Sequence, residues 1–89
     1  ENMSPLFVTK NVMDRGNSKA VGIDNEHLKL HMCSEKEKLS EMNGIAFKLG
    51  FHSEYVNKGL AFDICYAIQE NEWKGKRSIQ LAVKDIKTL

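Results

Sequence analysis

Residues 60–86 read LAFDICYAIQENEWKGKRSIQLAVKDI, and this stretch decides the fold that we predict for the chain. Apolar side chains occupy alternate positions in both of its arms, a period of two that is typical of a strand with one face on a core. The alternating residues are Phe62, Ile64, Tyr66 and Ile68 in the first arm and Ile79, Leu81 and Val83 in the second. The polar segment 70–77 between the arms contains the turn formers Asn71 and Gly75. The stretch therefore predicts two long strands joined as a β-hairpin.

The first third of the chain predicts two further strands. A strand over residues 6–15 follows Pro5, and apolar side chains on both of its faces suit a strand that bends across a barrel. Residues 16–18 break this strand, and residues 19–22 can continue it. Residues 27–33 alternate cleanly between apolar and polar positions. The side chains that this alternation places on the core are Leu28, Leu30 and Met32.

The middle of the chain predicts a short strand and a short helix. Residues 43–47 form the third strand, although Asn43 followed by glycine also fits a turn. The period then changes over residues 49–58, where Phe51 and Tyr55 lie four positions apart, as on one face of a helix.

This order of elements predicts the fold class. Five strands with one short helix between the third and the fourth is the order of the OB-fold, a mainly β, five-stranded Greek-key barrel. We expect residues 1–89 to form a single OB-fold domain that is a fragment of a larger multidomain protein. OB-folds bind their ligands on strands two and three and on the loops after strands one and four.

Charge is distributed unevenly along a chain whose formal net charge is only +1. Residues 73–89 carry five Lys or Arg against one acid, whereas residues 32–72 carry four Lys against seven acids. The sequence therefore describes a basic C-terminal element on a nearly neutral body.

Localisation and redox state follow from what the sequence lacks. It shows no secretory signal and no apolar run long enough to span a membrane, so we expect a cytoplasmic protein with no membrane partner. Cys33 and Cys65 sit in apolar alternating runs and are expected to be reduced, buried thiols.

The turn of the hairpin is the first candidate site. Trp73 can stack on a nucleobase, or it can fold over the end of the barrel or dock on another domain. Lys74, Lys76 and Arg77 can contact phosphates, and the alternative for them is a solvated turn.

The outer face of the second strand is the other candidate site. His27, Lys29 and His31 share this face and can contact a sugar-phosphate backbone, or they can form an ordinary exposed strand face. A metal site at the two histidines is excluded, because four residues along a strand span about 13 Å. Zinc–nitrogen bonds of about 2 Å cannot bridge that distance.

Catalytic residues are not apparent in the sequence. Asp63 and Asp85 each stand alone in a strand without a partner histidine or carboxylate, so we expect structural hydrogen bonds or salt bridges from them. The aromatic residues assigned to the core are Phe47, Phe51, Phe62 and Tyr66, with the alternative for Phe47 that it faces a ligand.

Several of these segments also resemble one known family. The segments 27–30 (HLKL), 45–47 (IAF), 62–64 (FDI) with 70–75 (ENEWKG), and 80–86 (QLAVKDI) are similar, in order and spacing, to the OB-fold domain of the single-stranded-DNA-specific exonuclease RecJ. The resemblance extends from Phe7 to Ile86. Asp24 and Glu26 depart from it, since glycine or a basic residue is more usual there, and this argues against a strong phosphate contact from the first loop.

The resemblance implies a function within a larger enzyme. RecJ proteins are hydrolases that degrade single-stranded DNA from its 5′ end in DNA recombination and repair, using Mn²⁺ or Mg²⁺ in a DHH-type catalytic core. The OB-fold domain helps to guide single-stranded DNA to that core. This chain has no Asp-His-His motif, so we expect the fragment to bind no cofactor and to be inactive as a nuclease on its own.

Three functions remain open from the sequence. The first is an auxiliary domain that binds single-stranded DNA. The second is a scaffold whose basic hairpin docks the DHH catalytic domains of the same polypeptide or recruits a single-strand-binding protein. The third, an independent hydrolase, lacks any constellation of nucleophile, base or metal ligands.

Overall fold

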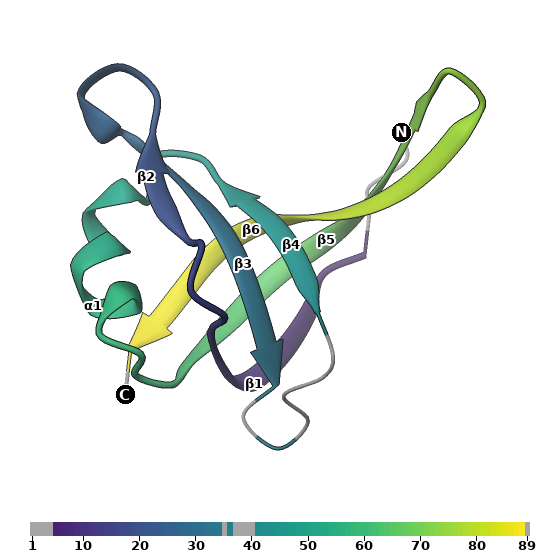
Figure 1. Ribbon diagram of the computed structural model, residues 1–89. Coiled ribbons are helices and arrows are strands. Elements are labelled where there is room, and N and C mark those ends of the chain that lie inside the picture. Colours follow the sequence, from purple (N-terminus) through teal and green to yellow (C-terminus); the bar gives the residue numbers. More distant parts are fainter. Residues whose placement is uncertain (1–4, 35, 37–40, 89) are drawn as a thin grey trace.

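A computed structural model describes residues 5–34, 36 and 41–88, and these residues form a closed β-barrel with one short helix (Figure 1). The strands are β1 (Phe7–Asp14), β2 (Lys19–Val21), β3 (His27–Ser34), β4 (Met42–Ala46), β5 (Phe62–Trp73) and β6 (Lys76–Thr88). The helical turns are the 3-10 helices η1 (Ile23–Asn25) and η2 (Gly50–His52) and the α-helix α1 (Ser53–Asn57). No helix among the described residues is long and apolar enough to cross a membrane.

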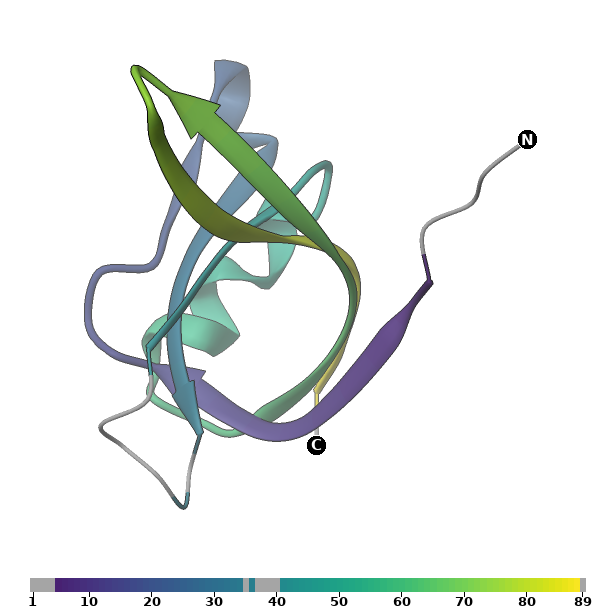
Figure 2. The same ribbon diagram turned by 90° about the vertical axis from the view of Figure 1, so that its right-hand side faces the viewer.

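The sheet closes on itself around a ring of five strands. Its order is β1-β5-β6-β4-β3-β2, and β1 also pairs with β3, which joins the two ends of the ring. All pairings are antiparallel except β4 with β6, which run parallel. Viewed along the barrel, the strands curve around the core and α1 lies behind them at the far end (Figure 2). The predicted OB-fold class is confirmed by this arrangement.

The predicted number of strands is wrong by one within the described residues. Residues 19–21 do not continue the first strand, because the chain turns sharply after Asp14, and Gly16 takes a positive φ of 118°. The short strand β2 pairs only with β3 and lies outside the ring of five.

The core follows the predicted alternation for most of its length. Ile68 and Ile79, however, are 48% and 65% exposed and do not face the core, because the hairpin continues past the barrel there. The buried residues that pack together are Val12, Leu28, Leu30, Met32, Ala46, Val56, Phe62, Ile64, Leu81, Val83 and Ile86. Because successive side chains of a strand point to opposite faces, Phe62, Ile64 and Tyr66 of β5 all face inward.

Strand β1 bends as its sequence predicts. Its first half pairs with β5 and its second half with β3, with a register shift between Thr9 and Val12. Asn11 sits at the shift with a φ of 59°. The Asn11 backbone N–H donates to Asp63 Oδ1 at 3.0 Å, so a side chain satisfies the donor that the bulge removes from the ladder.

The hairpin is longer and its turn tighter than predicted. The ladder continues to the pair Trp73 and Lys76, which leaves only Lys74 and Gly75 in the loop. Both loop residues have positive φ, 52° and 78°, as a type I′ turn requires. Segment 70–77 is therefore mostly strand.

Two aromatic residues assigned to the core lie at the surface. Phe47 is 63% exposed and Phe51 is 74% exposed, whereas Phe62 is fully buried and Tyr66 packs against the core. Phe47 comes directly after Ala46, whose buried side chain faces the core opposite Leu28, so Phe47 points to the outer face of the barrel. Phe51 lies in η2 rather than in one continuous helix over 49–58, because the helical segment splits into a 3-10 turn and a single short α-turn.

Candidate functional site

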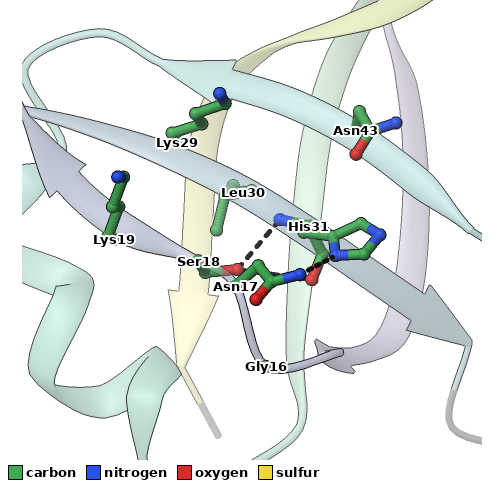
Figure 3. Close-up of a pocket in the computed structure, with 8 residues that line it drawn as sticks. All are labelled: Gly16, Asn17, Ser18, Lys19, Lys29, Leu30, His31 and Asn43. Atoms are coloured by element: carbon green, nitrogen blue, oxygen red, sulfur yellow. Dashed lines mark hydrogen bonds between the residues drawn. The ribbon is translucent and has the colours of Figure 1, made fainter.

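A groove runs over the outer face of β3 and β4, on the side of the sheet away from the core (Figure 3). It encloses about 620 Å³. The residues that line it are Gly16, Asn17, Ser18, Lys19, Lys29, Leu30, His31 and Asn43. Three of these residues, 16–18, belong to the loop after β1, and Lys19 belongs to β2. Residues 29–31 come from β3, and Asn43 comes from β4.

Two lysines lie side by side in this groove. Lys19 of β2 and Lys29 of β3 are directly opposite in the antiparallel register, and both are exposed. Like charges in this position repel each other. Among the described residues that line the groove none is acidic, so the pair is a site where an anion would lower the electrostatic free energy.

The loop that forms one wall of the groove is held by hydrogen bonds. Asp14 Oδ1 accepts the backbone N–H groups of Gly16 at 2.9 Å and Ser18 at 3.1 Å. Ser18 Oγ accepts the His31 backbone N–H at 2.9 Å, and the Asn57 amide donates to the Ser18 carbonyl at 2.9 Å. Burial raises the pKa of the Asp14 carboxyl, but the hydrogen bonds from Ser18 and Gly16 outweigh it and the net pKa lies below the ordinary value.

His31 contributes to the groove mainly by holding its neighbours. Its Nε2 lies 2.9 Å from Glu41 Oε1, and its Nδ1 lies 3.4 Å from the amide nitrogen of Asn17. An amide nitrogen only donates, so Nδ1 accepts and Nε2 carries the proton given to Glu41. The hydrogen bond from His31, followed by the nearby Arg15 charge, lowers the pKa of Glu41. Both ring nitrogens are thus engaged without a ligand.

His27 is similarly engaged at the other end of β3. Its Nδ1 accepts the backbone N–H of Lys48 at 2.9 Å, and its Nε2 lies 3.7 Å from Glu26. Its ring also meets Phe47 edge-on, with centroids 5.1 Å apart. Of the three residues predicted on the outer face of β3, Lys29 is the one that projects as an exposed cation.

The hairpin tip does not present its residues as one cluster. Trp73 is 74% exposed and pairs with Lys76, while the Lys74 ammonium lies 5.7 Å from the centre of the indole ring. Arg77 is opposite Glu72, one position further along β6, and so faces the other side of the ribbon from Lys76. Its guanidinium lies 3.7 Å from Glu70.

The remaining polar candidates serve the barrel. Asp63 holds the bulge of β1, as described above, and Asp85 Oδ1 accepts the Ile86 backbone N–H at 2.9 Å. The hydrogen bonds predicted for these two acids are therefore observed. Cys33 is buried and Cys65 half-buried, and both are free thiols. The described residues contain no group of three or more His, Cys, Asp or Glu arranged to hold a metal ion.

The structure joins predicted and unpredicted residues in the groove. Lys29 and His31 were predicted from their alternation, but Lys19, Asn17 and Asn43 were not. Lys19 could have been found only from the pairing of β2 with β3, which the sequence leaves open. Trp73, Lys74, Lys76 and Arg77 lie on the hairpin ribbon, which extends beyond the barrel away from α1 (Figure 1).

The fold and this groove define the class of protein, a small OB-fold barrel with a polar, cation-bearing outer face. The chain belongs to the family of RecJ OB domains, whose model matches residues 1–85. The resemblance noted in the sequence is thereby confirmed.

A solved structure has a similar fold. The mitochondrial single-stranded DNA binding protein Rim1 from S. cerevisiae superposes with a TM-score of 0.67 and 18% sequence identity, covering 98% of this chain and 97% of that one. No match was found among curated proteins.

Proposed function

We propose that this chain is a single-stranded-DNA-binding domain, and that it guides one DNA strand to the catalytic core of a RecJ-type exonuclease. Membership in the RecJ OB family and the fold shared with a single-stranded DNA binding protein support the first part. From the family resemblance we propose that the parent enzyme is a 5′-to-3′ exonuclease whose DHH domains use Mn²⁺ or Mg²⁺, and that it acts in repair and recombination. A cytoplasmic location is proposed separately, from the features of the sequence.

The observation that carries the proposal is the lysine pair in the groove. Lys19 and Lys29 lie on the surface where OB-folds bind oligonucleotides, between the loop after β1 and strand β4. A phosphate placed between them relieves their repulsion and gains two charge-assisted contacts. Asn17 and Asn43 line the same groove with amide donors and acceptors.

The proposal is tested by titrating a labelled single-stranded oligonucleotide with the protein at several salt concentrations. With three or four phosphate contacts, the logarithm of the binding constant should fall with the logarithm of salt at a slope of about −2 to −3. Each lost phosphate contact reduces the steepness of the slope by roughly 0.7. The slope of the double variant Lys19→Ala/Lys29→Ala should therefore be shallower by about 1.4.

The matched control removes two lysines from another face of the barrel. Lys10 and Lys87 line a separate small groove together with Asp63 and Asp85, so their removal changes net charge equally but not the proposed site. Lys10→Ala/Lys87→Ala should leave the slope near its original value. An equal change of slope in both double variants would contradict the proposal. So would binding by the unaltered protein that does not depend on salt, or that is equally strong for duplex DNA.

A second function, docking onto another protein domain, is favoured by the hairpin ribbon. Every residue from Ile68 to Ile79 is exposed, and among them Ile79 is 65% exposed and Trp73 is 74% exposed. A free-standing ribbon with exposed apolar side chains can dock onto the catalytic domains of the same polypeptide or onto single-strand-binding protein.

Replacing Lys74, Lys76 and Arg77 together by Ala distinguishes the two functions of the tip. Loss of DNA affinity with an unchanged unfolding transition assigns these cations to DNA. Unchanged DNA affinity, together with weaker association with the purified catalytic domains, assigns the tip to docking.

A further inference from the structure

The turn from β4 into η2 carries two exposed phenylalanines within five residues. Phe47 and Phe51 expose 63% and 74% of their surface, and Ile23 of η1 exposes 85%. A single exposed apolar side chain is ordinary on a protein surface. Two exposed phenyl rings on one short turn, beside the cation Lys48, are the kinds of side chain on which single-stranded nucleic acids stack and to which they are attracted. We call Phe47, Lys48 and Phe51 the aromatic turn.

Both rings are held in place by histidines. The Phe47 ring meets the edge of His27 at a centroid distance of 5.1 Å and an interplanar angle of 77°. The Phe51 ring lies 4.3 Å from the ring of His52, tilted by 35°. These contacts restrict each phenyl ring while leaving most of it open to solvent, so little conformational entropy remains to be lost on binding.

The backbone beneath the rings is also fixed. Lys48 takes a φ of 64°, uncommon for a residue with a side chain, and its N–H donates to His27 Nδ1. Gly50 packs so closely on η1 that an added Cβ would meet the Asn25 carbonyl oxygen at 2.0 Å. The Gly50 N–H donates to the Glu26 carbonyl at 2.9 Å. The turn is therefore tied to both β3 and the loop after β2.

The charges around the aromatic turn favour a base over a phosphate. A second groove of about 550 Å³ lies on the Phe51 side of the turn, and Phe51 and Lys48 line it together with Asp24 and Glu26. Two carboxylates oppose the binding of a phosphate there, whereas the uncharged π-face of a base suits a phenyl ring. A stack of this kind is tolerant of sequence because every base has a π-face.

The aromatic turn continues the lysine groove along the same strand. His27, which contacts Phe47, lies two residues before Lys29 on the outer face of β3, a distance of about 6.6 Å along the strand. A DNA strand whose phosphates lie at Lys19 and Lys29 therefore reaches the aromatic turn within one or two nucleotides.

From this arrangement we infer that Phe47 and Phe51 form a stacking site for nucleobases at the η1 end of the groove. The inference rests on the proposed function and adds to it the residues that bind the bases. The exposed loop after β1 and the lysine pair bind the backbone, and the aromatic turn binds the bases that follow.

The test compares an ordinary oligonucleotide with an abasic one of the same length, about 12 nucleotides, within the site sizes of OB-folds. The protein should bind the abasic strand at least about fivefold more weakly, because stacking is worth about 1 to 3 kcal/mol per base. Phe47→Leu/Phe51→Leu keeps the apolar character but removes the π-faces. This variant should bind the ordinary strand at least about fivefold more weakly and lose most of the discrimination against the abasic strand.

A matched control makes the same exchange at another exposed phenylalanine. Phe7 of β1 is 43% exposed, and Phe7→Leu should leave both affinities unchanged. If the protein binds the ordinary strand but Phe47→Leu/Phe51→Leu retains full affinity and discrimination, the stacking inference fails and the proposed function stands. If the unaltered protein binds no single strand at all, both fail. Full affinity of the leucine variant with weakened binding to the catalytic domains would assign the rings to protein docking instead.

Photocrosslinking gives a second readout that needs no variant. Trypsin cuts after lysine, so Phe47, Phe51 and Trp73 fall in the separate peptides 39–48, 49–58 and 59–74. An oligonucleotide carrying halogenated uracil should crosslink to the first two peptides. Crosslinks confined to peptide 59–74 would overturn the inference.

Discussion

The two halves of the β5–β6 hairpin share the same strands and the same ladder but differ in what covers them. In the barrel half, the inward side chains of β5 are Phe62, Ile64 and Tyr66, which pack against the core. In the ribbon half the same side of the strand carries Glu70 and Glu72, and both faces of the ribbon are exposed.

This difference separates a rigid region from an adaptable one. The barrel half is fixed by buried apolar contacts on one face, which supply most of the free energy of folding. The ribbon half depends on its ladder and its type I′ turn, and an isolated two-stranded hairpin is at best marginally stable in water. We therefore expect the groove to offer a preformed surface and the ribbon to open locally at low free energy.

The sharpest test of the comparison truncates one aromatic residue in each half of β5. Phe62→Ala should lower the free energy of unfolding by about 3 to 5 kcal/mol, because it leaves a cavity in the core. Trp73→Ala should change it by less than about 0.5 kcal/mol, because the indole is exposed. Urea denaturation followed by circular dichroism measures both. Comparable losses in the two variants would show that the ribbon packs against the barrel.

A smaller effect is expected where the loop of the groove is tied to the barrel. Asp14→Asn keeps an oxygen acceptor for Gly16 and Ser18 but removes the charge, and should cost about 1 kcal/mol, the difference between charged and neutral hydrogen bonds. The folded-state pKa of Asp14 lies below its ordinary value of 3.8. The stability that the Asp14 charge contributes is therefore complete above the ordinary value. It is lost as the pH falls through the lower folded-state value.

Denaturation curves between neutral pH and pH 2 should therefore converge for the original protein and Asp14→Asn at the acid end. The variant should also bind single-stranded DNA more weakly at neutral pH, since the loop precedes Lys19. A constant difference in stability at every pH would mean that the Asp14 charge does not hold the loop.

The smallest effect is expected for the ion pair of the ribbon. Arg77 and Glu70 are both largely exposed, so Arg77→Ala should change the free energy of unfolding by less than about 0.5 kcal/mol. A double-mutant cycle with Glu70→Ala measures their coupling. A coupling above about 1 kcal/mol would show that the ribbon is more ordered than its exposure indicates.

The candidate site was only partly predictable from the sequence. Alternation placed Lys29 and His31 on one outer face, and that placement is correct. It could not show that Asn17 and Glu41 engage both ring nitrogens of His31, because those contacts join three separate segments of the chain. Whether His31, or any of the other predicted residues, touches DNA stays a prediction.

The two misassigned aromatics have a physical cause. Phe47 fits the apolar alternation of its strand, and Phe51 fits a helical spacing with Tyr55. In β4, however, the buried Ala46 faces the core opposite Leu28, so alternation places Phe47 on the outer face. A periodic pattern does not by itself show which of its faces another element will cover.

The sequence by itself determined the five strands of the barrel, most of their inward positions and the OB-fold order, because side-chain alternation and turn formation are local properties of the chain. The tertiary structure alone decided that Lys19 lies opposite Lys29, that Arg77 faces away from Lys76, and that the aromatic turn lies open beside the groove. These relations depend on strand register and on the closure of the barrel, which arise from packing between segments far apart in the sequence.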